Sequence, residues 1–460
     1  MAFIANPGPV GYREMWIMRP DGTGARKLFE VDANGGFSGA EWSPDGRRLS
    51  FEWGQRIGDK EDWKMVSRDL QGGPPETAIP AGIVDWSWSP DWRMIYSTDE
   101  PQSGPGSCNF WTVDLNRRTG KPLAPARRLT NWAGFCIDNP SVTADARLLA
   151  FRRWSPQGDV YVASLENKKL NTSLPRRLTL SEGSNYPTSW TADNTAVIFE
   201  SFQDGRWQIF KQALDSDAAD PIETGIDEDV LDARLSAEGG GIFYVAVPKG
   251  SVPSPMRKVM SVPLSGGTPK LVMSSNTYGG PRCSRPPSTL CAIAEQTPDR
   301  EQLIFTAFDS DSRGRELTRF KTDPKSYFNY VWDLSPDGTR IAVLKGSENR
   351  ITILSLRGER LREITVSRWN ELQSVDWESR GEELFVSSHT TDGVVLLRVD
   401  QRGKAHVVWE HKGKIAPWNW PPSKWLVGPS APWAVPSPDG HHIAIYEWNM
   451  NANMWMMENF

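Results

Sequence analysis

The stretch "AEWSPDGRRLSFEW" (Ala40–Trp53) decides the fold of this chain. An aromatic segment ends there, the chain passes through Ser-Pro-Asp-Gly, and a second apolar segment follows at once. Pro44 presets the backbone φ of the turn, Asp45 can accept hydrogen bonds from nearby backbone N–H groups, and Gly46 supplies a positive-φ position. We therefore predict a β-hairpin in which Asp45 is a turn residue and not a catalytic carboxylate.

The same turn recurs along the whole chain, with a mean spacing of about 49 residues, the range of one four-stranded propeller blade. A β-branched or aromatic segment follows each turn, as expected for a strand, and no long segment has helical periodicity. The acidic position of the turn, or its degenerate equivalent, falls at Asp45, Asp91, Asp145, Asp193, Glu238, Asp299, Asp337, Arg380 and Asp439.

These repeats resemble the TolB-like, WD40-like repeats called PD40. The resemblance covers nearly the whole chain and implies an all-β fold, a β-propeller of four-stranded antiparallel blades. We expect a single domain over residues 1–460, with about eight blades drawn from the nine counted repeats. Residues 1–36 hold surplus strands and 434–460 hold an incomplete blade, so we expect the two ends to close the ring together. Two smaller propellers are the alternative.

The segment "KGKIAPWNWPPSKWLVGPSAPW" (412–433) lengthens one repeat and is rich in Pro and Trp. A long insertion of this kind is costly to expose unless it covers something. We expect it to plug the channel or to cover the ring junction, with a docking surface as the alternative.

Composition argues against several classes of function. The 460 residues carry a net charge of −5 without a Lys/Arg-rich block, so we expect this domain to bind no nucleic acid. Nucleotide, zinc-protease, calcium-loop and hydrolase motifs are not found in the sequence. We therefore expect no catalytic residue, no metal and no cofactor, and we interpret the chain as a non-enzyme.

The four cysteines fall into two local pairs. Cys108 precedes the third strand of one repeat and Cys136 precedes the inner strand of the next, so both lie on one face of neighbouring blades, within disulfide reach. Cys283 and Cys291 bracket a short turn. We predict both bridges on the ligand-facing rim and, from them, a periplasmic or extracytoplasmic location. Four buried thiols in a cytosolic protein are the alternative.

Candidate ligand-binding residues lie in the segments that lead into the inner strands, near the expected channel mouth: Asp138, Asn139, Asn185, Tyr186, Asn329 and Tyr330. Trp63 and Trp154 lie outside the repeating register, where an indole could stack on a sugar or peptide. Loop capping and packing between blades are the structural alternative for all eight. Four tryptophans within the register are expected to pack between blades: Trp42, Trp88, Trp190 and Trp377.

The ending "SPDGHHIAIYEWNMNANMWMMENF" resembles propeller regions of bacterial sensor proteins linked to a kinase or a winged-helix domain. That resemblance implies a ligand-sensing or protein-interaction domain, with a protein, small molecule or glycan at the channel face and a further N-terminal domain in the full-length protein. A TolB-like periplasmic protein is a second form of this hypothesis. The alternative class is an enzyme, either the accessory propeller of a peptidase or a carbohydrate-active propeller.

The cysteine pairing is directly testable. We expect mass spectrometry of the aerobically purified chain, alkylated without reduction, to detect no modified cysteine, and to detect four after reduction. Peptide mapping should join Cys108 to Cys136 and Cys283 to Cys291. Four alkylated thiols before reduction would contradict the extracytoplasmic interpretation.

Overall fold

The structure is a computed structural model, and it describes residues 1–5, 14–30, 35–57, 60–71, 74–79, 82–100, 107–166, 169–170, 175–181, 184–203, 206–248, 257–276, 279–324, 330–346, 348–391, 393–412 and 434–460. These residues form β-strands and connecting turns, with no helix among them. The strands make nine sheets, seven of which have four strands. The chain is an all-β propeller.

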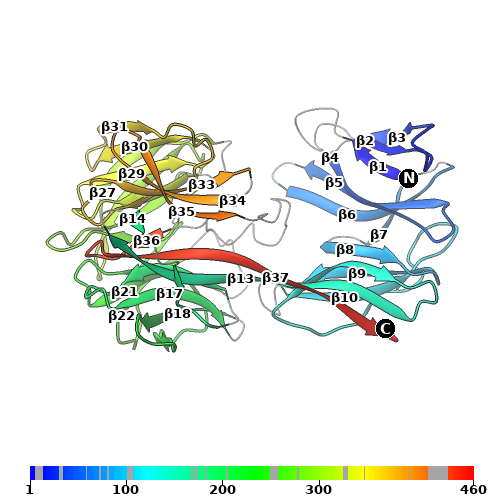
Figure 1. The fold of residues 1–460 in the computed structure, drawn as a ribbon, viewed down its shortest axis with the longest axis horizontal. Helices are drawn as coiled ribbons and strands as arrows, with labels where there is room; N and C mark the ends of the chain where they lie inside the picture. Colours follow the sequence, from blue (N-terminus) through cyan, green and yellow to red (C-terminus); the bar gives the residue numbers. More distant parts are fainter. Residues whose placement is uncertain are drawn as a thin grey trace. The chain divides into compact units, whose positions relative to one another are not determined.

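The chain divides into two compact units (Figure 1). Unit 1 comprises Met1–Pro156 with Met450–Phe460, and unit 2 comprises Gln157–Asn449. Each unit is described separately below.

Unit 1 contains one three-stranded sheet and two four-stranded sheets. The three-stranded sheet is formed by β1 (Ala2–Ala5), β2 (Glu14–Ile17) and β3 (Arg26–Glu30). The next sheet contains β4 (Gly35–Trp42), β5 (Arg48–Ile57), β6 (Lys60–Asp69) and β7 (Glu76–Ile79). The third contains β8 (Ile83–Trp88), β9 (Arg93–Asp99), β10 (Cys108–Asp114) and β11 (Arg127–Arg128).

Unit 2 contains five four-stranded sheets, each an antiparallel meander. The first consists of β16 (Asn185–Trp190), β17 (Ala196–Gln203), β18 (Arg206–Ala213) and β19 (Asp220–Pro221). The second consists of β20 (Asp229–Leu235), β21 (Gly241–Val247), β22 (Arg257–Pro263) and β23 (Lys270–Ser275). The third consists of β24 (Arg282–Cys283), β25 (Cys291–Gln296), β26 (Gln302–Phe308) and β27 (Arg313–Lys321). The fourth consists of β28 (Tyr330–Leu334), β29 (Arg340–Lys345), β30 (Arg350–Ser355) and β31 (Arg360–Thr365). The fifth consists of β32 (Asp376–Trp377), β33 (Leu384–Thr390), β34 (Gly393–Val399) and β35 (Ala405–Lys412).

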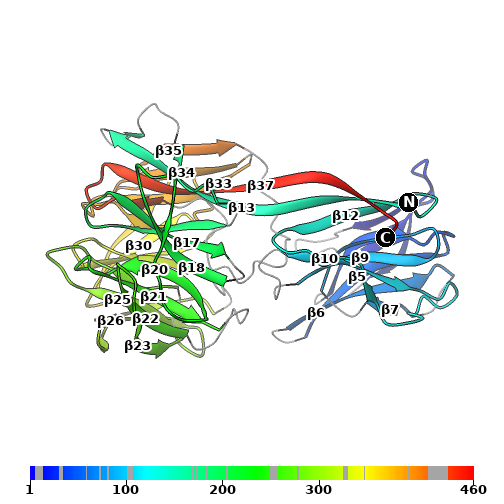
Figure 2. The same ribbon diagram turned by 90° about the horizontal axis from the view of Figure 1, so that it is seen from below.

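A ninth sheet contributes strands to both units. It orders β12 (Cys136–Val142), β13 (Leu148–Glu166), β37 (His442–Glu458) and β36 (Ala434–Pro436), while β14 (Lys169–Leu170) and β15 (Arg176–Arg177) also pair with β13. Both ribbon views show β13 and β37 side by side (Figures 1 and 2). The Leu165 N–H donates to the His441 carbonyl (2.7 Å) and the Asn459 N–H to the Arg147 carbonyl (3.1 Å), so the antiparallel register is the same at both ends.

The chain ends pair differently from the sequence-based expectation. In the described residues, C-terminal strand β37 pairs with β13, whereas N-terminal strands β1–β3 form a sheet of their own. The physical reason is edge pairing: β36 and the first half of β37 combine with the second half of β13 and with β15, which gives unit 2 a further set of four strands.

Unit 2 is a closed ring of six such sets. Its inner strands contact each other in the cyclic order β36, β16, β20, β24, β28, β32 and back to β36. The inner strands of a propeller surround its central channel, so the side chains on their inward face share one small space.

The turn predicted at Ala40–Trp53 forms as expected. The Ser43 hydroxyl donates to Asp45 Oδ1 (2.8 Å), the Arg47 N–H donates to the same oxygen (3.1 Å), and Gly46 has φ +69°. The same hydroxyl-to-carboxylate bond closes five more turns, at Thr143–Asp145, Thr191–Asp193, Thr297–Asp299, Ser335–Asp337 and Ser437–Asp439. These Asp residues are structural.

One counted turn has a different place from the others. Asp299 lies between β25 and β26, the second and third strands of its sheet, whereas the other turns join a first strand to a second. The equivalent turn of this sheet is Ser284–Leu290, between β24 and β25, and it lacks the acidic residue. The displaced turn explains why the repeat spacing is long before Asp299 and short after it.

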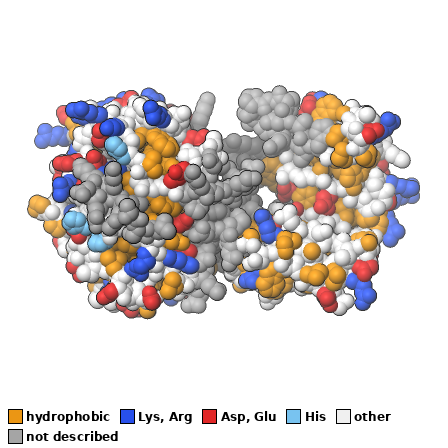
Figure 3. All heavy atoms as spheres, viewed as in Figure 1, with side chains coloured by type: hydrophobic (Ala, Val, Ile, Leu, Met, Phe, Trp, Pro, Cys, Tyr) orange, Lys and Arg blue, Asp and Glu red, His pale blue; other side chains and the backbone are white. Residues whose placement is uncertain are grey.

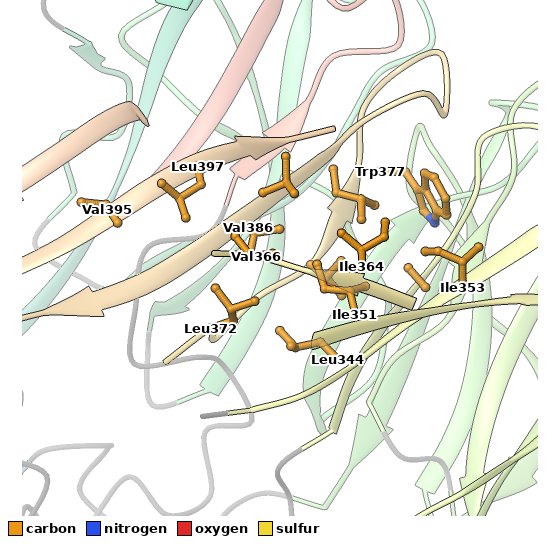
Figure 4. Packing of buried hydrophobic residues seen from close by; sticks show 14 residues of the cluster. Leu344, Ile351, Ile353, Ile364, Val366, Leu372, Trp377, Val386, Val395 and Leu397 are labelled. Atoms are coloured by element: carbon orange, nitrogen blue, oxygen red, sulfur yellow. The ribbon is translucent and has the colours of Figure 1, made fainter. Parts of the chain in front are cut away.

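Neighbouring sheets pack through apolar side chains. One buried cluster joins the sheet of β28–β31 to the sheet of β32–β35 (Figure 4); its members include Leu344, Ile351, Ile353, Ile364, Trp377, Val386 and Leu397. The register tryptophans add hydrogen bonds between sheets. Trp190 Nε1 donates to the Val435 carbonyl (2.7 Å), Trp377 Nε1 to the Asp333 carbonyl (3.3 Å), and Trp88 Nε1 to Ser50 Oγ (3.1 Å). Packing between blades is therefore confirmed for these three.

Two glycines of unit 1 test how tightly its sheets pack. Both have positive φ, +69° at Gly46 and +57° at Gly39, but a Cβ at residue 46 would have no atom within 4 Å, whereas one at residue 39 would lie 2.3 Å from Trp86 Cη2. Gly46→Ala should destabilise unit 1 by about 1–2 kcal/mol through backbone strain alone. Gly39→Ala should cost about 1–3 kcal/mol more because the buried indole must move. Urea unfolding of the two variants would measure the difference, and equal losses would contradict this packing.

Candidate functional site

The predicted rim residues of unit 1 are bound within the protein. Asp138 is buried and accepts from Arg152 Nε (2.7 Å) and Nη2 (2.5 Å). Asn139 adopts φ +50° at a bulge of β12, and its N–H donates to Asp85 Oδ2 of the neighbouring sheet (2.7 Å). Asn139 Nδ2 also donates to Asp138 Oδ1 (2.9 Å). Asn139 therefore joins two sheets, whereas the hydrogen bonds of Asp138 lie within its own sheet.

Of the described rim residues of unit 2, Asn185 and Tyr330 are buried and Tyr186 is partly buried. Asn185 is 0% exposed and its Nδ2 donates to the Gly158 carbonyl (3.2 Å). The ring of Tyr186 stacks on Tyr446 with a centroid distance of 4.7 Å. Tyr330 is buried, and its hydroxyl oxygen accepts from the Asp323 N–H (2.8 Å). These contacts hold the starts of β16 and β28 in place.

The two predicted stacking tryptophans differ from each other. Trp154 is 3% exposed, so it presents no ring face to a ligand. Trp63 is 37% exposed, and its indole covers Gly54 on the paired strand β5, where a Cβ would lie 2.3 Å from Trp63 Cδ2. The remaining rim residue, Asn329, and residues 413–433 of the Pro/Trp-rich segment lie outside the described residues.

Both predicted cysteine pairs are bridged in the structure. Cys108 and Cys136 have a Cα–Cα distance of 4.4 Å, and Cys283 and Cys291 one of 4.1 Å. Their places differ from the expectation of a common rim. Cys136 begins the inner strand β12, whereas Cys283 ends the inner strand β24 beside the turn. The two bridges therefore lie at opposite ends of their inner strands.

The charged groups that come together in unit 2 form what we call the channel cluster: Glu200, Asp232, Arg234, Arg282, Asp333 and Asp376. They come from five different sheets, through β17, β20, β24, β28 and β32. Their charges influence one another across these sheets. Side chains from five sheets of one ring can interact in this way because the inner strands converge on the channel. This cluster is the candidate site.

Part of the cluster is fixed by direct contacts. Asp333 Oδ2 accepts from the Trp377 N–H (2.8 Å), and Asp333 Oδ1 lies 3.7 Å from Arg282 Nε. Glu200 Oε1 accepts from the Ala233 N–H (2.6 Å). The side chains of Arg282 and Asp333 are each 16% exposed, so this pair is open in part to solvent. The cluster is therefore ordered in part by backbone hydrogen bonds, and its Arg282–Asp333 pair is not fully buried.

Burial and neighbouring charges shift the pKa of several of these groups. Burial and the charge of Asp232 together raise the pKa of Glu200 to about 8, against the lowering effects of the Ala233 N–H, Arg234 and Arg282. Burial and the charge of Asp333 raise the pKa of Asp376 to about 7. Burial and the charge of Arg282 lower the pKa of Arg234 to about 10. At neutral pH the channel therefore holds two arginines beside two carboxyl groups, Glu200 and Asp376, that retain much of their protons.

A sequence signal for this cluster exists, although none of the predicted site residues belongs to it. Four members occupy one repeated position, two residues before the turn begins: Arg234, Arg282, Asp333 and Asp376. The next residue along packs between sheets. Because side chains alternate along a strand, the earlier position faces away from that packing. Polar residues recurring there indicate the channel, whereas the residues predicted from sequence lie at the strand starts.

Unit 1 contains a second group of buried carboxyls. Burial and the charge of Asp85 raise the pKa of Glu52 to about 7. The pKa of Glu41 is likewise about 7, through burial and Asp85, although the Trp88 N–H donates to its Oε2 (3.3 Å). Burial raises the pKa of Asp85. The N–H groups of Asn139 and Trp86 and the charge of Arg152 lower it in part.

Among the described residues, no three or more His, Cys, Asp or Glu side chains are grouped so that they could hold a metal ion. No helix in this part of the chain is long and apolar enough to cross a membrane. On the face drawn in Figure 3, positive and negative side chains are interspersed.

Several solved structures are similar to this chain. A protein from Agrobacterium tumefaciens assigned as TolB has 16% sequence identity and a TM-score of 0.46, covering 64% of this chain and 99% of that chain. TolB from Acinetobacter baumannii has 17% identity and a TM-score of 0.23, covering 66% and 58%. A GH74 enzyme from Niastella koreensis has 12% identity and a TM-score of 0.33, covering 94% and 70%. No family model and no curated protein matches the chain. The TolB-like resemblance of the repeats thus has counterparts among solved structures, and it concerns the fold alone.

The raised pKa of Glu200 has a measurable consequence. Between pH 4.5 and pH 8 the folded state holds a proton on Glu200 that the unfolded state has released, so the contribution of Glu200 to stability falls as pH rises through this window. Glu200→Gln keeps a carbonyl acceptor for the Ala233 N–H and removes the titration. Between pH 5 and pH 8 the free energy of unfolding of the variant should therefore rise relative to that of the wild type. The expected change is at least about 1.4 kcal/mol, the equivalent of one pKa unit.

Denaturant unfolding at several pH values would measure this. Glu359→Gln, at an exposed turn position, is the matched control and should follow the wild type. Parallel pH curves for the wild type and Glu200→Gln would contradict the burial of an ionisable carboxyl in the channel.

Proposed function

We propose that this chain is a non-enzymatic binding propeller, which senses a polar ligand or binds a partner protein through the channel of unit 2. The observation that carries the proposal is the channel cluster, in which charged side chains from five sheets meet. A ring that only had to be stable would gain little from such a centre, because removing charges from water is costly unless they are well paired. Convergent polar groups in a concave site are typical of ligand binding.

The two disulfides support the second part of the proposal, an extracytoplasmic location. Bridges of this kind persist in oxidising compartments and are rare in the cytosol. We propose that the chain is the extracytoplasmic part of a larger bacterial regulatory protein with a kinase or winged-helix domain, or else a TolB-like periplasmic protein. Fusing the gene to alkaline phosphatase, which is active only outside the cytoplasm, would test the location.

The binding function can be tested on the purified chain. We expect a thermal-shift screen with peptides, oligosaccharides and small polar metabolites to yield a ligand that raises the melting temperature. Arg282→Met and Asp376→Asn should each weaken binding of that ligand at least tenfold in isothermal titration, because each removes one charge from the channel. Arg360→Met is the matched control, since its side chain is 63% exposed in unit 2, and it should bind like the wild type.

Two outcomes would contradict the proposal. The first is a ligand whose affinity is unchanged in both channel variants. The second is turnover of an oligosaccharide or peptide. One observation favours that enzymatic alternative: the raised carboxyl pKa values of Glu41 and Glu52 are those expected of a general acid at neutral pH. Turnover that is lost in Glu52→Gln would assign the activity to unit 1.

A further inference from the structure

The second half of β37 forms an exposed sheet edge in unit 1. There β12, β13 and β37 make a set of three strands, whereas the neighbouring sheet of β8–β11 has four. The strand β36 pairs with β37 only at Ile443–Ile445. Among the described residues, no strand lies beyond residues 450–458 of β37, whose course along β13 is visible in Figure 2. The position of a fourth strand is open.

Apolar side chains cover both faces of this edge. Met454 is 70% exposed, Trp455 47% and Met456 62%. Successive side chains of a strand point to opposite faces, so Trp455 lies on one face and the two methionines on the other. Arg153 of β13 lies 4.7 Å from the Trp455 ring centroid, which holds the indole against the sheet. Long apolar edges of this kind are sites of pairing with another chain.

The hydrogen-bonding groups of the edge can be assigned from the register. Because the Asn459 N–H donates to β13, the odd-numbered residues of this half-strand direct their backbone groups toward β13. The even-numbered residues Ala452, Met454, Met456 and Glu458 therefore direct theirs outward. A further strand could bond to these four residues without disturbing the existing sheet.

We propose that a second copy of this chain occupies the edge, with the two β37 strands paired antiparallel about a two-fold axis. The charge pattern favours this occupant. From Trp448 to Met457 the sequence "WNMNANMWMM" has no charged residue. A two-fold pairing centred near Met454 and Trp455 places Glu458 opposite residues 450–452 of the other copy, which are Met, Asn and Ala. Like charges therefore do not oppose each other.

This pairing gives a closed, isologous dimer. Each copy offers the same edge, so the contact satisfies both strands and leaves no free edge to recruit a third chain. The joined sheet has the strand order β12, β13, β37, β37, β13, β12, and six strands is a common sheet size. Met454 and Met456 of the two copies lie on a common face, where they cover each other.

The decisive variant is Met454→Pro. Proline lacks an N–H, and at an edge strand it is tolerated where that N–H faced solvent. Met454→Pro should therefore keep the β13–β37 pairing and abolish the dimer. Met454→Leu is the matched control, because it keeps the outward N–H and an apolar side chain. The double variant Met454→Lys/Met456→Lys should also give monomer, by placing like charges across the two-fold axis.

Sedimentation velocity of the full chain, over a concentration series, would measure the mass. The wild type and Met454→Leu should approach the mass of two chains, and both disrupting variants should remain at the mass of one with an unchanged circular dichroism spectrum. Hydrogen exchange should show protection at the amides of residues 452, 454 and 456 that rises with concentration. A wild type that is monomeric throughout, or a dimer that persists in Met454→Pro, would overturn the proposal. Protection of these amides in a monomer would also overturn it, because another segment of the chain would then cover the edge.

Discussion

The hydroxyl–carboxylate turn is the local interaction on which the repeated structure depends. In each example a Ser or Thr hydroxyl donates to the Asp carboxylate, and a backbone N–H two residues after the Asp donates to the same oxygen. The hydroxyl and the backbone N–H at Arg147 lower the pKa of Asp145 in this way. The turn fixes where the inner strand ends and thus its register. Register in turn decides which side chains pack between sheets and which face the channel.

Much of the fold could be predicted from sequence because this turn is local. The repeated turns are enough to predict four-stranded antiparallel blades, and the packing of Trp88, Trp190 and Trp377 follows from their places in the register. The pairing of the chain ends could not be predicted because it is non-local. The pairing of β13 with β37 joins segments almost 300 residues apart, and no local pattern records it. The turn at Asp299 was assigned to the wrong pair of strands, because the same hydroxyl–carboxylate turn can also join a second strand to a third.

The candidate site was predicted less well, for a related reason. Asn185, Tyr186 and Tyr330 have the residue types of a binding surface, but in the structure they hold strand ends and neighbouring sheets together. A polar residue that secures a loop and one that contacts a ligand look alike in sequence. The channel cluster was predictable in principle, because four members share one register position. Finding it required aligning the repeats on the turn and asking which side of the inner strand each position faces.

The composition of the channel cluster also determines how a ligand would act on the ring. Two arginines meet four carboxyl groups, and burial raises the pKa of Glu200 to about 8 and of Asp376 to about 7, so the charge of the channel changes near neutral pH. An anionic ligand adds negative charge beside these carboxyls and favours their protonated forms. By linkage, its affinity must rise as the pH falls through this range. A cationic ligand must show the opposite trend, so the sign of the pH dependence identifies the charge of the ligand before its structure is known. Because the groups belong to five sheets, the same binding energy also stabilises the closed ring, through mass action on the folded state.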